Sequence, residues 1–356
     1  MYLGAPSTSV KLCDSDGVFH FLKRYAGEPV AARARVAVVA NDALGNFVVA
    51  TPLLQMLRSV HAPRKLDFFG GARTAELQDA SELIDTAYNL HGPPPERALA
   101  LAAAAGNYDL VINLEAGPLA QVAASVLAGE AGCVVGPCVG SGGRGVLATA
   151  TDDRGRLAID PNWMRPDICG AYPFLASPWI GEIFCRLAYL DGPVPAYSVP
   201  SKAPARDIPD VLIATAASSS DKLWSGWSEA IEVVRMRGHS VGLLGAPPAA
   251  QKAFWQGDDT EEQLVKEGLV VDLRGKLSLP EVVGALAKAK AVLTLDNGIM
   301  HLAAATPTPT VALFRPGIRR LWAPPSSTLH TLEPRDGSPV SDILVKDVIE
   351  ALDAAL

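Results

Sequence analysis

Three adjacent residues, Asp296, Asn297 and Gly298, stand between two segments of different character and have side chains suited to binding. The apolar run Ala291–Leu295 has the length and composition of a buried strand, and Ile299–Ala305 is typical of a short packed helix. Open parallel sheets bind ligands beyond the carboxyl ends of their strands, and the free N–H groups of a helix start suit a phosphate. An ordinary helix cap explains the same three residues.

Further residues of the second half have types that suit an anionic ligand. Lys222 lies in a loop after the predicted strand Val211–Thr215, and Lys276 follows the predicted strand Leu269–Leu273. A lysine can neutralise charge on a leaving phosphate, although a single lysine is also an ordinary surface residue. His301 is equally compatible with a packed core histidine and with a ligand contact.

The first half of the chain contains a second unit of strand, glycine-containing loop and helix. The predicted strand Arg35–Ala40 is followed by the loop Asn41–Asn46 and then by a predicted helix, Phe47–Val60, with Pro52 in its early part. Proline is tolerated in a first turn because that N–H has no helical partner. The motif G-x-G-x-x-G is absent, which disfavours a dehydrogenase.

Strands alternate with helices along most of the chain, which predicts parallel α/β sheets with right-handed crossovers. A Pro-rich stretch suggests a linker between two such domains. Residues 341–356 are expected to form a helix with Ser341 as N-cap, and Phe19–Tyr25 a short helix in an N-terminal extension of unassigned role. The predicted boundaries are 1–195 for the first domain (1–33 being the extension), 196–210 for the linker, 211–340 for the second domain and 341–356 for the final helix.

The composition excludes several classes of protein. The chain has 356 residues, is 49% hydrophobic and carries a formal charge of −7, with Lys and Arg scattered, so nucleic acid is not the expected partner. No apolar run is long enough to cross a bilayer and no signal peptide is evident, so a cytoplasmic protein is expected, with peripheral membrane contact left open. The five cysteines form no zinc pattern, and no metal is expected.

Several motifs occur in an order that resembles the bacterial family 9 glycosyltransferases, which include the lipopolysaccharide heptosyltransferases. Leu44–Arg58 is similar to the family's G-D-x-x-x-x-T-P-x-L-x-x-L-R, and Lys222-Leu223-Trp224 to its K-x-W. Gly275–Leu279 matches G-K-x-S-L. The most specific stretch, Leu295–Phe314, is similar to D-S-G-x-x-H-x-A-A-x-x-x-x-P-x-x-x-L-F-G.

The resemblance implies a GT-B fold, in which two Rossmann-like domains have parallel sheets that face a central cleft. It implies metal-independent transfer, with inversion, of a heptose or related sugar from a nucleotide-diphosphate donor to a hydroxyl of a lipopolysaccharide core or a natural product. The nucleotide-sugar is a co-substrate, and no other cofactor is expected. The donor would be held in the second domain by Lys222, Lys276, Asp296, Asn297, Gly298 and His301, with Lys222 stabilising the leaving diphosphate.

Two positions depart from the family pattern. Asn46 stands where the family has the aspartate of G-D, the base that takes the acceptor proton, and an amide cannot serve in that role. Asp42, in the same loop, is the first choice to replace it, and Glu115, at the end of the predicted strand Tyr108–Leu114, is the second. If neither acts, the protein is a non-catalytic nucleotide-sugar or glycan-binding protein of the same fold. Arg315 replaces a glycine, which adds a positive charge near the phosphate site or marks a reshaped loop.

Overall fold

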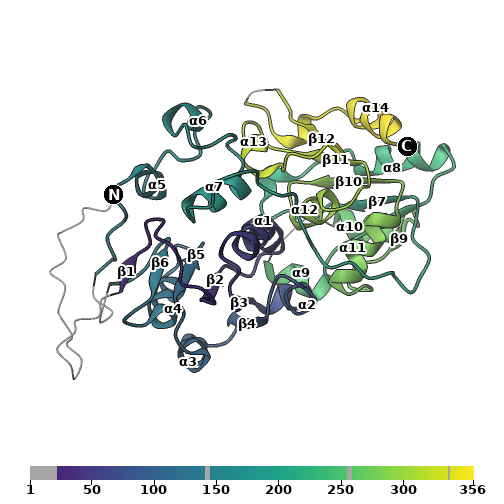
Figure 1. The fold of residues 1–356 in the computed structure, drawn as a ribbon. Coiled ribbons are helices and arrows are strands. Elements are labelled where there is room, and N and C mark those ends of the chain that lie inside the picture. The colour runs from purple at the N-terminus through teal and green to yellow at the C-terminus, as the bar shows by residue number, and fades with distance from the viewer. Residues whose placement is uncertain (1–21, 141–144, 255–258, 336) are drawn as a thin grey trace, which may run out of the picture. The chain divides into compact units, whose positions relative to one another are not determined.

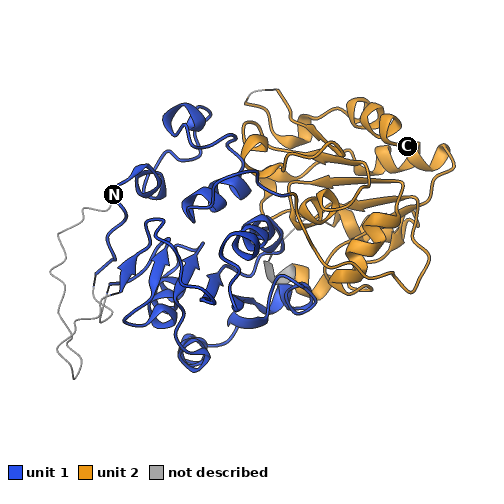
Figure 2. Ribbon diagram, viewed as in Figure 1, with its two compact units in different colours: residues 1–195 blue, residues 196–356 orange. Residues whose placement is uncertain are grey.

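Short runs of aliphatic and β-branched residues form two six-stranded parallel sheets, one in residues 1–195 and one in residues 196–356 (Figure 2). The computed structural model describes residues 22–140, 145–254, 259–335 and 337–356 (Figure 1). Both sheets are α/β layers whose parallel strands are joined by helices, so the predicted α/β class is confirmed. Each unit is described below by itself, and the cleft between the two sheets stays a prediction.

In the first unit, the strands lie in the order β1-β6-β5-β2-β3-β4. The chain first forms the edge strand β1, continues with the central strand β2, adds β3 and β4 on one side, and then crosses back to place β5 and β6 on the other side. The strands are β1 (Lys23–Arg24), β2 (Arg35–Val39), β3 (Lys65–Gly71), β4 (Thr86–His91), β5 (Leu110–Asn113) and β6 (Cys133–Val135). The helices are α1 (Leu44–His61), α2 (Ala75–Asp79), α3 (Pro95–Ala105), α4 (Pro118–Ala128), α5 (Asp153–Ala158), α6 (Ile168–Ala171) and α7 (Ile180–Leu187), with a 3-10 turn η1 (Ala72–Thr74).

The second unit repeats this construction, in the order β12-β11-β10-β7-β8-β9. Its strands are β7 (Val211–Ala214), β8 (Val241–Leu243), β9 (Val271–Asp272), β10 (Ala291–Leu295), β11 (Thr310–Leu313) and β12 (Leu329–Leu332). Its helices are α8 (Trp227–Met236), α9 (Pro248–Phe254), α10 (Thr260–Lys266), α11 (Leu279–Lys288), α12 (Gly298–Ala304), α13 (Arg319–Trp322) and α14 (Val345–Ala355), with a 3-10 turn η3 (Ser220–Lys222).

The order of the strands gives each sheet one topological switch point, where the loops that follow two adjacent strands lead to opposite sides. It lies between β2 and β5 in the first unit and between β7 and β10 in the second. Open α/β sheets bind ligands at such points. The residues directly after these four strands are therefore the ones that the fold places for chemistry.

At the ends of the chain one predicted helix is wrong, and another is present but starts later than predicted. Lys23–Arg24 is not helical but forms the edge strand β1, which pairs with β6, and residues 19–21 lie outside the described part. The Arg24 guanidinium fixes this edge because it donates to the carbonyls of Ala148 and Leu147, each at 2.9 Å. The final helix begins at Val345 with Leu344 as its N-cap, because Ser341 is part of a 3-10 turn.

Helix α1 begins at Leu44, so Asn46 lies in its first turn and Pro52 is an interior residue. This differs from the prediction of a helix that starts at Phe47 with proline near its start. An interior proline leaves the carbonyl four residues earlier, here Val48, without its helical N–H. The Thr51 hydroxyl donates to the Val48 carbonyl oxygen at 2.8 Å and replaces the missing bond. Pro52 thus removes one backbone hydrogen bond from this buried helix, and the neighbouring Thr51 hydroxyl supplies another in its place.

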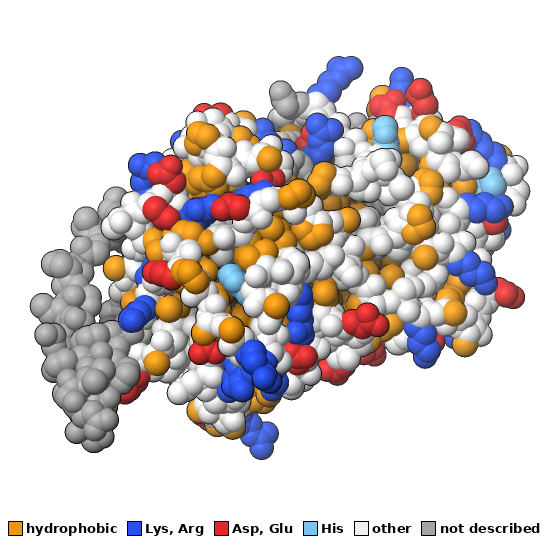
Figure 3. All heavy atoms as spheres, viewed as in Figure 1, with side chains coloured by type: hydrophobic (Ala, Val, Ile, Leu, Met, Phe, Trp, Pro, Cys, Tyr) orange, Lys and Arg blue, Asp and Glu red, His pale blue; other side chains and the backbone are white. Residues whose placement is uncertain are grey.

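Figure 3 shows how charged side chains are distributed on one face of the molecule. On the face drawn in Figure 3, Lys and Arg side chains are interspersed with Asp and Glu and form no continuous basic area. Within the described residues, no helix is both long enough and apolar enough to cross a membrane.

We expect Thr51→Val to lower the free energy of unfolding by about 1–2 kcal/mol, because the buried Val48 carbonyl would lose its donor. Urea unfolding measures this loss. In a Pro52→Ala background the restored backbone N–H can bond Val48, so the same substitution should cost less than about 0.5 kcal/mol. An equal loss in the two backgrounds would show that the hydroxyl does not substitute for the missing N–H.

Candidate functional site

At the switch point of the second sheet, the loops after β7 and β10 are joined by an ion pair. The Lys222 Nζ donates to Asp296 Oδ2 at 2.8 Å and to the Asp296 carbonyl oxygen at 3.2 Å. The two side chains are only 14% and 7% exposed. Two residues that are 74 positions apart in sequence, and that were both predicted for the site, are therefore in direct contact at the carboxyl edge of the sheet.

Trp224, the tryptophan of the K-x-W motif, holds the loop that orients Lys222. Trp224 is buried, its indole N–H donates to the Ile343 carbonyl oxygen at 2.8 Å, and its ring packs edge-to-face on Trp227 with centroids 5.1 Å apart. This fixes the loop in the core two residues after Lys222. The lysine itself ends the 3-10 turn η3 and is turned toward the start of α12.

Asn297 is the N-cap of α12. Its Oδ1 accepts hydrogen bonds from the N–H groups of Ile299 (2.9 Å) and Met300 (3.2 Å), and its Nδ2 donates to the Ala216 carbonyl oxygen at 2.9 Å. The cap that the sequence analysis kept as an alternative is therefore present, and the same side chain ties the end of β10 to the loop after β7. Gly298 precedes both capped amides, so its N–H is not used by the cap.

His301 is a buried residue of α12, with 3% of its surface exposed. Its Nδ1 lies 3.2 Å from the Tyr197 hydroxyl, and its ring contacts the rings of Tyr197 and Trp322. Burial lowers the pKa of His301 to about 4, so the imidazole is neutral at pH 7. In this form it carries no positive charge, and its contacts with Tyr197 and Trp322 are those of a packed core residue.

Lys276 belongs to a different part of the sheet. It follows β9, which β8 separates from β7, so it leaves the sheet two strands away from the strand that precedes Lys222. Its Nζ donates to the Asp272 carbonyl oxygen at 2.7 Å, and its side chain is 46% exposed. The structure thus brings Lys222 and Asp296 together with Asn297 and Gly298, but places Lys276 on a neighbouring loop.

Arg274, two residues past β9, was not among the residues predicted from the sequence and is only 5% exposed. Its guanidinium contacts Asp272 (3.0 Å), Glu261 (3.2 Å) and Glu262 (2.9 Å), and Glu261 also accepts a hydrogen bond from the Thr215 hydroxyl at 2.7 Å. This network links the loops after β7 and β9. A charged residue directly after an apolar run was the only signal in the sequence.

At the switch point of the first sheet, Glu115 follows β5 and accepts hydrogen bonds from the backbone and side chain of Asn41, which follows β2. Burial raises the pKa of Glu115, while these hydrogen bonds partly oppose that shift. The neighbouring Asn113 holds the loop, because its Oδ1 accepts from the Glu115 N–H at 3.0 Å and its Nδ2 donates to the Glu115 carbonyl oxygen at 2.9 Å.

Asp42 and Asn46 lie near the same edge of the first sheet but differ in their surroundings. The Asp42 Oδ1 accepts a hydrogen bond from the Arg73 backbone N–H at 2.9 Å, and its carboxylate lies so close to Gly71 that a Cβ there would clash with it. Asp42 thus connects its loop to η1. Asn46 is half-buried in the first turn of α1.

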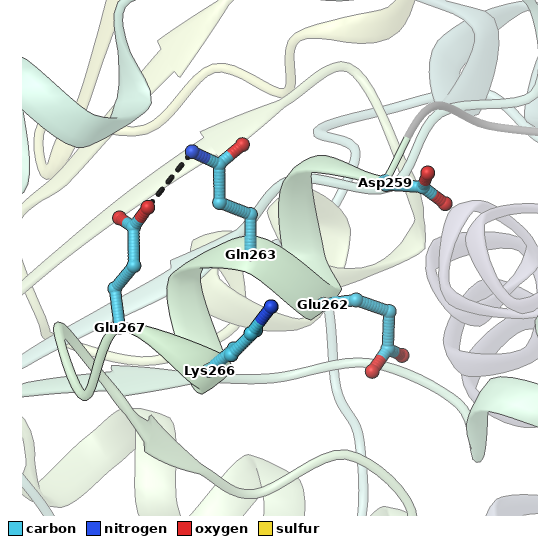
Figure 4. A pocket seen from close by; sticks show the side chains of 5 residues that line it. All are labelled: Asp259, Glu262, Gln263, Lys266 and Glu267. Atoms are coloured by element: carbon cyan, nitrogen blue, oxygen red, sulfur yellow. Dashed lines mark hydrogen bonds between the residues drawn. The ribbon is translucent and has the colours of Figure 1, made fainter.

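A surface hollow of about 510 Å³ lies along α10 and is lined by none of Lys222, Asp296, Asn297 and Gly298 (Figure 4). Three of the side chains that line it are carboxylates and one is a lysine, a balance that repels a diphosphate. The lining residues are Asp259, Glu262, Gln263, Lys266 and Glu267. In the part of the chain that the structure describes, no three His, Cys, Asp or Glu residues are grouped so that they could hold a metal ion.

Comparison with known proteins identifies a family whose model matches most of the second unit. Residues 196–333 match the family model of glycosyltransferase family 9 (heptosyltransferase). Lipooligosaccharide heptosyltransferase 2 of Haemophilus influenzae is 32% identical over 108 residues, which are 30% of this chain and 30% of that protein. Lipopolysaccharide heptosyltransferase 1 of Salmonella typhimurium is 34% identical over 113 residues, 30% of this chain and 32% of that protein. The chain therefore matches about a third of the length of these relatives, and the family resemblance is confirmed there.

Solved structures extend the likeness to the fold of most of the chain. A family 9 glycosyltransferase from Veillonella parvula superposes with a TM-score of 0.66 at 16% identity, covering 92% of this chain and 99% of that one. The E. coli ADP-heptose lps heptosyltransferase II gives a TM-score of 0.63 at 18% identity, covering 90% and 98%. At this identity the comparison shows the fold, and the predicted GT-B fold is confirmed.

We expect Lys222→Met to lower the free energy of unfolding by about 3 kcal/mol, because it leaves the Asp296 carboxylate buried without its cation. Urea unfolding of the Lys222→Met/Asp296→Asn double variant should recover most of the loss. The control is Lys276→Met, whose half-exposed side chain should contribute less than about 1 kcal/mol. A double variant no more stable than the single one would contradict the pairing.

Stability should fall as the pH is lowered from 7 to 4.5, in part through His301. Because its native pKa of about 4 lies below the ordinary 6.5, the unfolded chain takes up a proton first, and stability present above pH 6.5 is lost toward pH 4. The full difference corresponds to about 3 kcal/mol.

We therefore expect His301→Gln to flatten the slope of unfolding free energy against pH in this window, as measured by urea unfolding at several pH values. His61→Gln should also flatten the slope, since burial lowers the pKa of His61 as well, and it tests the same linkage at a site outside α12. A wild-type slope in His301→Gln would mean that His301 is not buried in its neutral form.

Proposed function

We propose that this protein is an inverting, metal-independent glycosyltransferase that moves a heptose or related sugar from a nucleotide-diphosphate donor to a hydroxyl acceptor. The observation that carries the proposal is the contact of Lys222 with Asp296 at the switch point of the sheet that matches the family model. The donor class follows from a structural relative, whose name identifies it as an ADP-heptose heptosyltransferase.

On the donor side, Lys222 has the position and the free donor capacity to bind a phosphate. An ammonium group has three N–H donors, and Asp296 uses two of them, one through its carboxylate and one through its carbonyl. The third can reach a diphosphate oxygen beside the Gly298 N–H. Asp296 then keeps the ammonium in place before the donor arrives, so that little reorganisation is needed as charge develops on the leaving diphosphate.

On the acceptor side, we assign the base to Glu115 and not to Asp42, the first choice from the sequence. Burial raises the pKa of Glu115, which makes its carboxylate a stronger base near neutral pH. Glu115 also bonds to Asn41 across the switch point between β2 and β5, whereas Asp42 bonds to the Arg73 amide in η1. In the proposed step, Glu115 takes the proton of the acceptor hydroxyl, the hydroxyl oxygen attacks the anomeric carbon, and the bond from that carbon to the diphosphate oxygen breaks.

The test is to incubate the protein with ADP-heptose and a panel of other nucleotide-sugars, with and without lipopolysaccharide core acceptors, and to measure sugar transfer and nucleotide release. We expect wild type to turn over at least one donor and Glu115→Gln to lower kcat about 10²–10⁴-fold, because the base is lost. The acidic limb of the pH profile of kcat/KM should lie above the ordinary carboxyl range, since the pKa of Glu115 is raised.

Asp42→Asn is the matched control for this experiment. The amide oxygen keeps the hydrogen bond from Arg73, so kcat should change by less than about fivefold. A protein that transfers and hydrolyses no sugar is not a glycosyltransferase and leaves only a binding role. Full activity in Glu115→Gln would instead remove Glu115 as the base.

A further inference from the structure

Arg315 lies at the edge of the second sheet where the residues proposed to hold the donor also lie. It follows β11, which pairs with β10 in parallel, and the Asp296 N–H donates to the Leu313 carbonyl oxygen at 3.1 Å. Arg315 is thus two residues past that contact, at the same edge of the sheet. The family pattern to which this stretch is similar has glycine here, so the arginine departs from that pattern.

The Arg315 guanidinium is directed to the loop that carries Lys222. Its terminal nitrogen lies 2.6 Å from Asp221 Oδ2, and Asp221 is the residue directly before the lysine. The Ser219 hydroxyl also donates to Asp221. These two contacts, with Ser219 contributing more, lower the pKa of Asp221, so the carboxylate is ionised throughout the neutral range.

The loop after β7 is therefore held on both sides of Lys222. On one side Trp224 is anchored to the Ile343 carbonyl, and on the other Asp221 is paired with Arg315. The short turn between them has no side-chain N-cap of its own. Misplacement of a catalytic group by about 1 Å can cost about 10²-fold in rate, so a second anchor next to the lysine has a functional consequence.

We infer that Arg315 is a positioning residue, which acts through Asp221 to hold Lys222 against the donor diphosphate. This inference rests on the proposed function for its effect on catalysis. Its structural part, the attachment of the 216–226 loop to the end of β11, is independent of that function. Because the Arg315 charge is paired with Asp221, the side chain is assigned no direct contact with the donor.

Hydrogen exchange tests the attachment without any substrate. The Lys222 and Leu223 amides donate to the carbonyls of Ser219 and Ser220 within the turn. In Arg315→Gln we expect peptides covering residues 216–226 to exchange up to about fivefold faster, the effect of losing an exposed ion pair. Arg319→Gln is the control, because Arg319 pairs with Glu333 and not with this loop. Unchanged exchange in Arg315→Gln overturns the inference.

Kinetics with the donor that wild type uses test the link to Lys222. We expect Arg315→Gln and Asp221→Asn each to lower kcat about tenfold, with the thermal midpoint nearly unchanged, and the swapped pair Asp221→Arg/Arg315→Asp to recover part of the loss. In a Lys222→Ala background, Arg315→Gln should have no further effect. Full additivity with Lys222→Ala would overturn the inference, because it means that Arg315 contacts the donor itself.

The two proposals fail in distinguishable ways. If no nucleotide-sugar is used by wild type, the proposed function fails, and the exchange experiment still decides whether Arg315 holds the loop. If wild type is active but Arg315→Gln matches Arg319→Gln in both experiments, only the role of Arg315 is wrong.

Discussion

The ion pair between Lys222 and Asp296 is the interaction on which the geometry of the second unit depends. Two charges that are almost fully removed from water lose several kcal/mol of hydration each, and their attraction offsets this only if the geometry is held closely. The pair therefore contributes little net stability, but it requires that the two loops hold Lys222 and Asp296 in a fixed geometry. Trp224 and Asn297 meet that requirement from opposite sides, the first by fixing the loop after β7 and the second by linking that loop to the end of β10.

The cost of removing polar groups from water also explains why polar residues gather at the strand ends in each unit. The strands of a parallel sheet are covered on both faces, so their residues are almost all apolar, and the first positions that tolerate polar groups are those just past the strand ends. In the first unit Asn41 and Glu115 meet across the switch point between β2 and β5, and Asn113 holds the second of these loops. The second unit uses a charged pair where the first uses amides around one carboxylate.

Sequence patterns predicted the parts of the fold in which local and tertiary preferences agree. The strand Ala291–Leu295 was predicted with its observed bounds, because apolar β-branched runs flanked by turn residues have few alternatives. The edge strand β1 could not be predicted, since its two residues pair with a strand about 110 positions away. Helix α1 begins without a side-chain cap, so no residue type marked its start at Leu44.

The motifs in the sequence marked candidate residues but did not indicate their contacts. Lys222 and Asp296 stand in motifs whose spacing marks them, yet nothing in the sequence says that they bind each other. His301 matches the same motif, and its burial, which makes it neutral, depends on Tyr197 and Trp322 from other segments. Arg274 and Arg315 were single charged residues after apolar strands, and only the folded chain reveals the carboxylates that they bind.

The substitution at Asn46 becomes understandable from the switch point of the first sheet. A transfer reaction needs a carboxylate at a given place beside the acceptor hydroxyl, but it does not require that carboxylate to come from one particular loop. Asn46 lies in the first turn of α1, the helix that follows the Asn41 loop, whereas Glu115 comes from the loop after β5 and bonds to Asn41. The loops after β2 and β5 meet at one edge of the sheet. A base supplied by the second loop, as we propose, would therefore lie at the same edge as one supplied from the first. The loss of the aspartate is therefore compatible with an active enzyme.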